Sequence, residues 1–224
     1  MTQNDAALFA VGAAQWLSAS SSRTSLGRDA VQLKGFATAA APELTAAIKS
    51  VAAVSPFRHM VTPGGWPMSV EMTNCGDVGW LTDATGYRYD SLDPDTGGRW
   101  PAMPESFLRV ATAAAAAAGF PSFAPDACLI NRYAPGARLS LHQDKDERDF
   151  SHPIVSVSLG LPAVFLWGGS KRADKPRIVA LHSGDVVVWG AASRLNFHGV
   201  KALSDGNHPL TGTFRLNLTF RHAL

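Results

Sequence analysis

From about residue 126 onward, short apolar segments follow one another closely, and this pattern constrains the fold more than any other feature. Segments such as ACLINRY, IVSVSLG, AVFLWG, RIVALHSG, DVVVWG and TFRLNLTFRHA are rich in Val, Leu, Phe and Thr, and Gly or Pro separates them. An earlier segment, WPMSVEMTN (66–74), alternates apolar and polar residues. Because no helices intervene between these closely spaced strands, the sequence predicts a mainly β fold with flanking helices, arranged as an antiparallel double-sheet roll rather than a doubly wound sheet.

Two helices are predicted before the run of strands. The segment APELTAAIKSVAAV (41–54) places Leu44, Ile48 and Val51 on one helical face. The segment MPESFLRVATAAAAAAG (103–119) has an Ala-rich body, which reflects helix propensity. We therefore expect three parts. Residues 1–27, which contain SASSSRTS, form a loosely ordered N-terminal arm, residues 28–101 form an N-terminal extension, and residues 102–224 form a helix followed by the roll.

Composition and charge limit the class of protein. Of the 224 residues, 46% are apolar and 17% are charged, so the chain can bury a substantial core. A net charge of +2 gives no global signature of nucleic-acid binding, so contacts with phosphates would depend on local basic clusters. Two cysteines, Cys75 and Cys128, suit a reducing compartment as buried thiols. A signal peptide begins with basic residues, but the first twenty residues contain no Lys or Arg. No apolar run is long enough to span a bilayer. We therefore expect a cytoplasmic protein without membrane association.

The segment LSLHQDKDE (139–147) carries the first candidate for chemistry. His142 and Asp144 are two residues apart at the end of a predicted strand, so their side chains can point at one ion. His198, in SRLNFHGV, is a candidate for a third ligand. Two histidines and one carboxylate form the facial triad of non-haem Fe(II) oxygenases, but the same set also binds zinc in hydrolases. At this level both metals remain open.

The last predicted strand, TFRLNLTFR, separates apolar and polar side chains by alternation. Its polar face carries Arg215, Asn217, Thr219 and Arg221. One alternative is a strand with one wet face. However, arginine suits bidentate binding of carboxylates, and although the two arginines are ~20 Å apart along an extended strand, they could hold a short dicarboxylate such as 2-oxoglutarate by leaning inward. Asn131 and Tyr133, in INRYAPG, are further candidate donors.

Five segments between about Pro56 and Arg221 form a recognisable set: SPFRHMVTPGGWPMSVEMTNCG, PDACLINRYAPGARLSLHQDKDE, IVSVSLGLPAVF, GDVVVWG and NLTFR. Together they resemble the AlkB family of Fe(II)- and 2-oxoglutarate-dependent nucleic-acid demethylases. This resemblance implies a double-stranded β-helix (jelly-roll) catalytic core, with the nucleotide-recognition lid in residues 28–101. Two positions depart from the family pattern: Trp66 replaces a tyrosine, and Asn196–Phe197 replace a Phe-Tyr pair.

The resemblance also implies roles for individual residues. The expected iron ligands are His142, Asp144 and His198. The expected 2-oxoglutarate contacts are Asn131, Tyr133, Arg215, Asn217 and Arg221. The expected substrate contacts are Trp80, Tyr87, Arg88, Tyr89, Asp146 and Arg172, with Trp80 stacking on the flipped base. Glu147, beside Asp146, is expected to be solvated.

The implied activity is direct-reversal repair of alkylated DNA by a monomeric enzyme. Single-stranded or duplex DNA, with RNA as a further candidate, would lose methyl groups from N1-methyladenine and N3-methylcytosine as formaldehyde, while 2-oxoglutarate and O2 become succinate and CO2. A base inside a duplex is unreachable and has to be flipped out. Two alternatives remain at this level: an Fe(II)/2-oxoglutarate hydroxylase that acts on a protein or small molecule, and an inactive nucleic-acid binding module.

Overall fold

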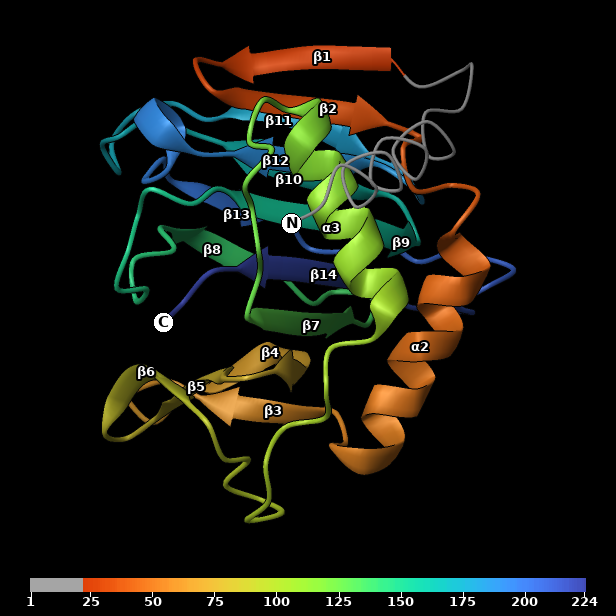
Figure 1. The fold of residues 1–224 in the computed structure, drawn as a ribbon, viewed down its shortest axis with the longest axis vertical. Coiled ribbons are helices and arrows are strands. Elements are labelled where there is room, and N and C mark those ends of the chain that lie inside the picture. The colour runs from red at the N-terminus through yellow and green to blue at the C-terminus, as the bar shows by residue number, and fades with distance from the viewer. Residues whose placement is uncertain (1–21) are drawn as a thin grey trace, which may run out of the picture.

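Two antiparallel sheets of unequal size form the body of the molecule (Figure 1). The structure, a computed structural model, describes residues 22–224. The larger sheet contains, in spatial order, β1 (Ser22–Gly27), β2 (Ala30–Lys34), β12 (Val186–Trp189), β9 (Ile154–Gly160), β14 (Arg215–Arg221), β7 (Ala127–Tyr133), β4 (Pro67–Gly76) and β3 (Arg58–Val61). The smaller sheet contains β11 (Arg177–Leu181), β10 (Ala163–Trp167), β13 (His198–Val200) and β8 (Leu139–His142). The strand pairs in both sheets are antiparallel, so the predicted jelly-roll core is confirmed.

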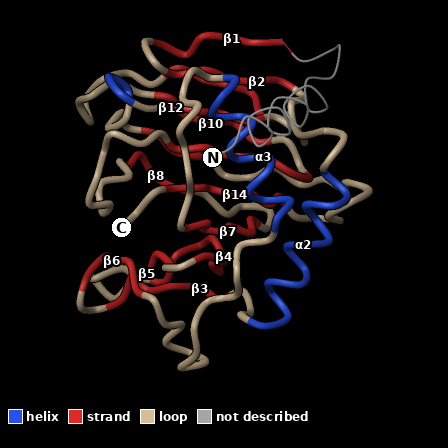
Figure 2. Tube along the Cα trace, in the orientation of Figure 1, coloured by secondary structure: helices blue, strands red, loops and turns tan. Residues whose placement is uncertain are grey.

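A hairpin and three helices complete the described chain. A separate hairpin is formed by β5 (Gly79–Asp83) and β6 (Gly86–Asp90). The helices are α2 (Ala41–Val54), α3 (Glu105–Ala117) and the short 3-10 helix η1 (Ala191–Ser193). Figure 2 shows α2 and α3 on the same side of the larger sheet.

The two long helices cover one face of the larger sheet with their apolar sides. Leu44, Ile48 and Val51 of α2 are buried, as the helical spacing predicts. Phe107 of α3 packs edge-to-face against Phe220 of β14, with ring centroids 5.9 Å apart. One of the two main apolar clusters of the protein therefore lies between these helices and the larger sheet.

The central strand β14 is buried on both of its faces. Its apolar side chains, such as Leu218, belong to the cluster beneath the helices. Its polar side chains point the other way, toward the smaller sheet, and they are buried as well. The alternative of a strand with one wet face is therefore wrong, because a second sheet covers the polar side of this strand.

A second apolar cluster lies against the smaller sheet. Phe165, Trp167 and Trp189 contact one another there, with ring centroids 5.8–6.4 Å apart. Both tryptophans are buried core residues. The predicted burial of Cys75 and Cys128 is also correct, since both are free, fully buried and opposite each other on β4 and β7.

The N-terminal part of the described chain differs from the expected loose arm. Residues 22–27 form β1, which pairs with β2, and β2 pairs in turn with β12 of the core. The polar composition of SRTSLG does not indicate a strand. Backbone hydrogen bonds to β2 hold these residues at the edge of the sheet. The rest of the expected arm, residues 1–21, lies outside the described residues.

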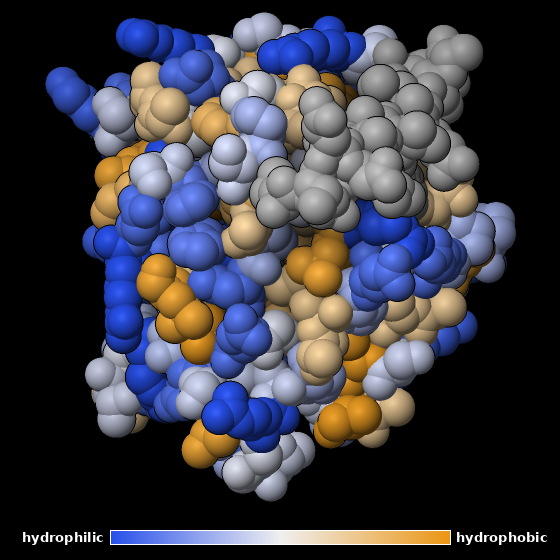
Figure 3. All heavy atoms as spheres, in the orientation of Figure 1, coloured by the Kyte–Doolittle hydropathy of each residue, from blue (hydrophilic) through white to orange (hydrophobic). Residues whose placement is uncertain are grey.

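The surface over the helical face is mixed. Figure 3 shows apolar side chains scattered there among charged and polar ones. Within residues 22–224, the structure contains no helix of the length and hydropathy needed to cross a membrane.

Candidate metal centre

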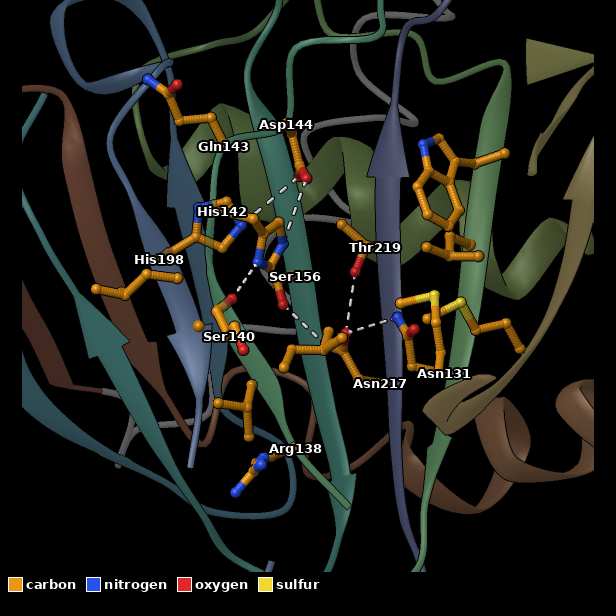
Figure 4. A pocket seen from close by; sticks show the side chains of 18 of the residues that line it. Asn131, Arg138, Ser140, His142, Gln143, Asp144, Ser156, His198, Asn217 and Thr219 are labelled. Carbon is orange, nitrogen blue, oxygen red and sulfur yellow. Dashed lines mark hydrogen bonds and ion pairs between the residues drawn. The ribbon is translucent and has the colours of Figure 1, made fainter. Parts of the chain in front are cut away.

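His142, Asp144 and His198 come together between the two sheets. Their ligand atoms all lie within 4.8 Å of one another. His142 ends β8, His198 begins β13, and these two residues are directly paired in the sheet. Asp144 follows two residues after His142, with carboxylate oxygens 3.7 Å from Nε2 of His142 and 3.8 Å from Nε2 of His198. Figure 4 shows the three side chains converging on one point. The structure therefore assembles the predicted two-histidine, one-carboxylate set.

Backbone carbonyl groups orient both imidazole rings in the same way. The Nδ1 atom of His142 lies 2.8 Å from the carbonyl oxygen of Ser140, and Nδ1 of His198 lies 3.1 Å from that of Asn196. A carbonyl oxygen only accepts hydrogen bonds, so each Nδ1 carries the proton. In the neutral form of this tautomer Nε2 is the unprotonated nitrogen, and both Nε2 atoms face Asp144, which is the arrangement that metal ligation requires.

Electrostatics keep His198 and Asp144 in their ligating forms. Burial, reinforced by the neighbouring His142, lowers the pKa of His198 to about 4, so this ring is neutral near pH 7. Burial alone would disfavour the charge on Asp144. However, the guanidinium of Arg221 and the two histidines outweigh that effect and hold the pKa of Asp144 well below its usual range. A neutral imidazole and an ionised carboxylate are both ready to bind a cation.

Gly199 allows β8 and β13 to approach closely beside the metal ligands. A Cβ atom at this position would lie 2.8 Å from the carbonyl oxygen of Leu139 and 3.1 Å from that of Ser140. We expect Gly199→Ala to push the two strands apart, to lower the unfolding free energy by about 1–3 kcal/mol and to weaken Mn(II) binding. Thermal unfolding and a Mn(II) titration measure both effects.

The exposed Gly98 provides the matched control for that substitution. A Cβ at Gly98 would meet only the Thr96 side chain, at 3.8 Å, so Gly98→Ala is expected to keep wild-type stability and Mn(II) affinity. Wild-type Mn(II) affinity in Gly199→Ala would contradict the inference that the close strand approach sets the ligand geometry.

The three candidate ligands lie on the wall of a cavity of about 790 Å³ between the sheets. The same cavity is lined by all five of the residues that the sequence associates with 2-oxoglutarate: Asn131, Tyr133, Arg215, Asn217 and Arg221. Arg221 donates to Asp144 over 2.8 Å, while the Arg215 guanidinium lies 4.8 Å from the ring centroid of Tyr133. The two arginines thus face one cavity from opposite ends of β14.

Several buried polar atoms on this wall have no hydrogen-bond partner among the described residues. They are Oδ1 of Asn131, Nε and Nη1 of Arg215, and Nη1 of Arg221. Buried guanidinium nitrogens are costly to leave unpaired. The unpaired donors within the described residues are nitrogens of two guanidinium groups, so they are cationic. Burial disfavours the charge on Arg215 and lowers the pKa of its guanidinium. A small dicarboxylate beside a divalent metal fits these residues, because its oxygens would pair with the free donors.

Two serines, Ser156 and Ser158, support the polar wall together with Thr219, and the sequence analysis does not predict a role for either serine. Ser158 accepts a hydrogen bond from Arg215 over 3.1 Å, and Ser156 accepts one from Asn217 over 2.8 Å. Thr219 donates to Oδ1 of Asn217 over 2.9 Å. The alternation of serine with valine in IVSVSLG was the available signal for a polar face on β9.

The β5–β6 hairpin contributes aromatic side chains to the cavity. Trp80 and Tyr87 line it and stack on each other, with ring centroids 5.8 Å apart. The indole Nε1 of Trp80 donates to Oδ2 of Asp146 over 2.8 Å, and Asp146 also lines the cavity. Since Tyr87 is exposed, this aromatic pair marks the solvent side of the cavity.

The remaining predicted substrate contacts are divided. Arg172 lines the cavity and donates to the carbonyl oxygen of Leu141 over 2.8 Å. Arg88 does not line it, and instead pairs with Asp83 on the same hairpin at 2.8 Å. Tyr89 also lies outside the cavity wall, because its hydroxyl group donates to Glu147 over 2.7 Å.

The expectation that Glu147 is solvated is wrong. Its side chain is only 1% exposed, and it pairs with Arg194 at 3.0 Å and with Arg221 at 3.2 Å. The burial of Arg194 is likewise not predicted by the sequence, because its neighbours in SRLNFHG do not indicate it.

Comparisons with known proteins agree with this geometry. The family model described as 2OG-Fe(II) oxygenase superfamily matches residues 29–221. The chain is 60% identical over 198 residues to "Alpha-ketoglutarate-dependent dioxygenase AlkB" from Escherichia coli, covering 88% of this chain and 92% of that protein. It is 31% identical over 150 residues to "tRNA demethylase abh1" from Schizosaccharomyces pombe, covering 65% of this chain and 50% of that protein.

A solved structure shows the same similarity in three dimensions. "The structure of OsALKBH1" superposes with a TM-score of 0.80 at 31% identity, covering 90% of this chain and all of that one. The family model spans nearly the whole described chain, and the E. coli relative is matched along most of both sequences. The chain therefore belongs to the 2OG-Fe(II) oxygenase superfamily and, within it, to the AlkB family.

Proposed function

We propose that this protein is an Fe(II)- and 2-oxoglutarate-dependent dioxygenase that removes methyl groups from N1-methyladenine and N3-methylcytosine in single-stranded DNA. The observation that carries the proposal is the shared cavity. One wall presents two histidines, a carboxylate and buried guanidinium nitrogens that have no partner within residues 22–224, and the solvent side presents stacked aromatic rings beside a carboxylate. The 60% identity to the E. coli dioxygenase supports it.

In this proposal His142, Asp144 and His198 hold Fe(II), leaving room in the coordination sphere for further ligands. Arg215 and Arg221 bind the two carboxylates of 2-oxoglutarate, and Asn131, Tyr133 and Asn217 line the same wall. When bound, Fe(II) with 2-oxoglutarate and O2 supplies the oxidising chemistry, in which 2-oxoglutarate becomes succinate and CO2 and the methyl group leaves as formaldehyde.

The protein's own residues orient the reactants. Backbone carbonyl groups fix both imidazole rings, and Arg221 fixes the Asp144 carboxylate. Trp80 and Tyr87 would receive a flipped base and exclude water from its outer side. A methylated base that cannot pair costs less to extrude, which favours damaged nucleotides.

Formaldehyde release tests the proposal. Single-stranded DNA oligonucleotides that carry one N1-methyladenine or N3-methylcytosine are incubated with protein, Fe(II) and 2-oxoglutarate, with unmethylated oligonucleotides as the control. We expect stoichiometric formaldehyde and succinate from the methylated strands only. A matched RNA series determines whether RNA is a second substrate, as the name of the S. pombe relative suggests. Succinate formation without any response to methylated DNA or RNA would favour a hydroxylase with another substrate.

Asp146 is the proposed reader of the base. Its Oδ2 atom accepts a hydrogen bond from the indole N–H of Trp80, which leaves Oδ1 able to accept one from an exocyclic amino group. N1-methyladenine and N3-methylcytosine are cationic near neutral pH, whereas N1-methylguanine and N3-methylthymine are neutral and present a carbonyl. We expect Asp146→Ala to lower turnover efficiency on the cationic bases by about 10- to 100-fold, the value of a charge-assisted hydrogen bond of roughly 1.5–3 kcal/mol, and to affect N1-methylguanine much less.

Asp146→Asn separates the charge from the packing of Trp80. The asparagine amide oxygen can still accept the indole hydrogen bond, so Trp80 keeps its position while the negative charge is lost. We expect selectivity for the cationic bases to fall in this variant too. Equal losses on cationic and neutral bases in both variants would mean that Asp146 only supports Trp80.

We also propose a cytoplasmic location, because the two free, buried cysteines suit a reducing compartment.

A further inference from the structure

We propose that Glu147 is a positioning residue of this site. It binds the guanidinium of Arg221 together with Asp144, and it anchors the β5–β6 hairpin through Tyr89. Glu147 does not line the cavity, so it acts through other residues. The inference rests on the proposed function, in which Asp144 binds the metal and Arg221 binds 2-oxoglutarate.

Arg221 is shared between two carboxylates. Its Nη2 atom donates to Oδ2 of Asp144 over 2.8 Å, and its Nε lies 3.2 Å from Oδ2 of Asp144 and 3.2 Å from Oε1 of Glu147. Its Nη1 atom is buried without a partner among the described residues. Asp144 and Glu147 both hold the edge of the guanidinium that carries Nε and Nη2. Their contacts fix the direction in which Nη1 points. Glu147 therefore helps to set the orientation of both Arg221 and Asp144.

Arg194 binds the same carboxylate and reaches both metal-ligand segments. It pairs with Oε2 of Glu147 at 3.0 Å and donates to the backbone carbonyl of Asp144 over 2.8 Å. It lies four residues before His198 in the chain. Two guanidinium groups and two carboxylates thus balance in a buried cluster, in which the loss of one carboxylate leaves an uncompensated positive charge beside the metal ligands.

The hairpin rests on two consecutive carboxylates. Trp80 donates to Asp146, and Tyr89 donates to Oε1 of Glu147 over 2.7 Å. Oε1 is the oxygen that also faces Arg221. A single carboxylate oxygen therefore joins the aromatic hairpin at the solvent side of the cavity to the arginine beside Asp144, so the hairpin and the ligand geometry are coupled.

Mn(II) binding, measured by electron paramagnetic resonance without oligonucleotide, tests the proposal. We expect Glu147→Gln to weaken Mn(II) binding by about 10- to 100-fold, which is typical for the loss of a residue that orients a metal ligand. Asp149→Asn is the matched control. Asp149 is half exposed and bonds within its own loop to Ser151, so wild-type affinity is expected. Wild-type Mn(II) affinity in Glu147→Gln would overturn the proposal.

Tyr89→Phe tests the link with the hairpin while it leaves the buried charges in place. We expect a smaller loss of Mn(II) affinity than in Glu147→Gln, and no additional loss when the two substitutions are combined, because both act through one carboxylate. Thr82→Val is the control. It removes a different hydrogen bond from the hairpin to the core, from Thr82 Oγ1 to the carbonyl oxygen of Val61, and should leave Mn(II) affinity unchanged.

The outcomes separate this inference from the proposed function. Equal losses in Tyr89→Phe and Thr82→Val would reduce Tyr89 to a general support of the hairpin and overturn the coupling, even if the wild-type protein demethylates DNA. If wild-type protein binds Mn(II) but releases no formaldehyde from methylated strands, the proposed function fails while the coupling is still measured. If Glu147→Gln does not fold, Tyr89→Phe against Thr82→Val decides the question alone.

Discussion

Alanine in place of His142, Asp144 or His198 is expected to abolish Fe(II)-dependent release of formaldehyde from N1-methyladenine and N3-methylcytosine strands. The ligand atoms of the three side chains lie within 4.8 Å of one another, so each substitution removes one of the three candidate ligands in the described part of the chain. The expected rate is that of wild-type protein treated with a chelator. Mn(II) titration provides a second measurement that does not depend on turnover.

The three variants should differ in stability. His142→Ala removes a partly exposed ring and should leave the unfolding free energy nearly unchanged. Asp144→Ala leaves the buried Arg221 with Glu147 as its one remaining carboxylate partner among the described residues, so about 3–5 kcal/mol of stability should be lost. His182→Ala, at a histidine whose side chain is 71% exposed outside the site, is the control for both measurements. Wild-type turnover in any of the three ligand variants would remove that residue from the metal site.

Local patterns in the sequence were sufficient for the strands and helices that carry the site. The alternation in TFRLNLTFR separates the arginines from the apolar side chains of β14, and the structure keeps that separation. The two-residue spacing of His142 and Asp144 places both beside one point. These features depend on backbone geometry that is repeated at every residue, so the sequence alone can reveal them.

What the sequence could not reveal depends on partners distant in the chain. Glu147 lies in the charged segment DKDE and resembles a surface residue, yet it is buried because Arg194 and Arg221 neutralise it. Nothing near Glu147 in the sequence indicates these partners. Similarly, residues 22–27 look like part of a polar arm, and only pairing with β2 makes them a strand. Burial of a charge and pairing at a sheet edge are tertiary properties.

The dependence on 2-oxoglutarate provides the second large effect, and Arg215 is the cleaner of the two arginines to test. Arg215 bonds only to the neutral Ser158 and stacks on Tyr133, while its Nε and Nη1 atoms have no partner among the described residues. Its removal therefore breaks no ion pair within residues 22–224. Arg221, by contrast, pairs with Asp144 and Glu147, so its removal would take the guanidinium partner away from the buried Asp144 and disturb the metal ligands as well.

We expect Arg215→Ala to raise the 2-oxoglutarate concentration needed for half-maximal turnover by about 10- to 100-fold or more, since a charged hydrogen-bond partner contributes roughly 1.5–3 kcal/mol. Mn(II) affinity should stay close to the wild-type value. Arg221→Ala should raise the requirement for 2-oxoglutarate and also weaken Mn(II) binding, because Asp144 loses its partner. The contrast between the two variants distinguishes binding of the co-substrate from orientation of the metal ligand.

Two further variants sharpen this test. Arg215→Lys keeps the positive charge but loses the two-pronged donor geometry, so a requirement between those of wild type and Arg215→Ala is expected. Arg138→Ala removes an arginine that also lines the cavity but is exposed and lies apart from the metal ligands in Figure 4, so it should leave the 2-oxoglutarate requirement unchanged. If Arg215→Ala and Arg138→Ala respond alike, the unpaired donors of Arg215 do not bind the co-substrate, and the polar face of β14 serves only the packing between the sheets.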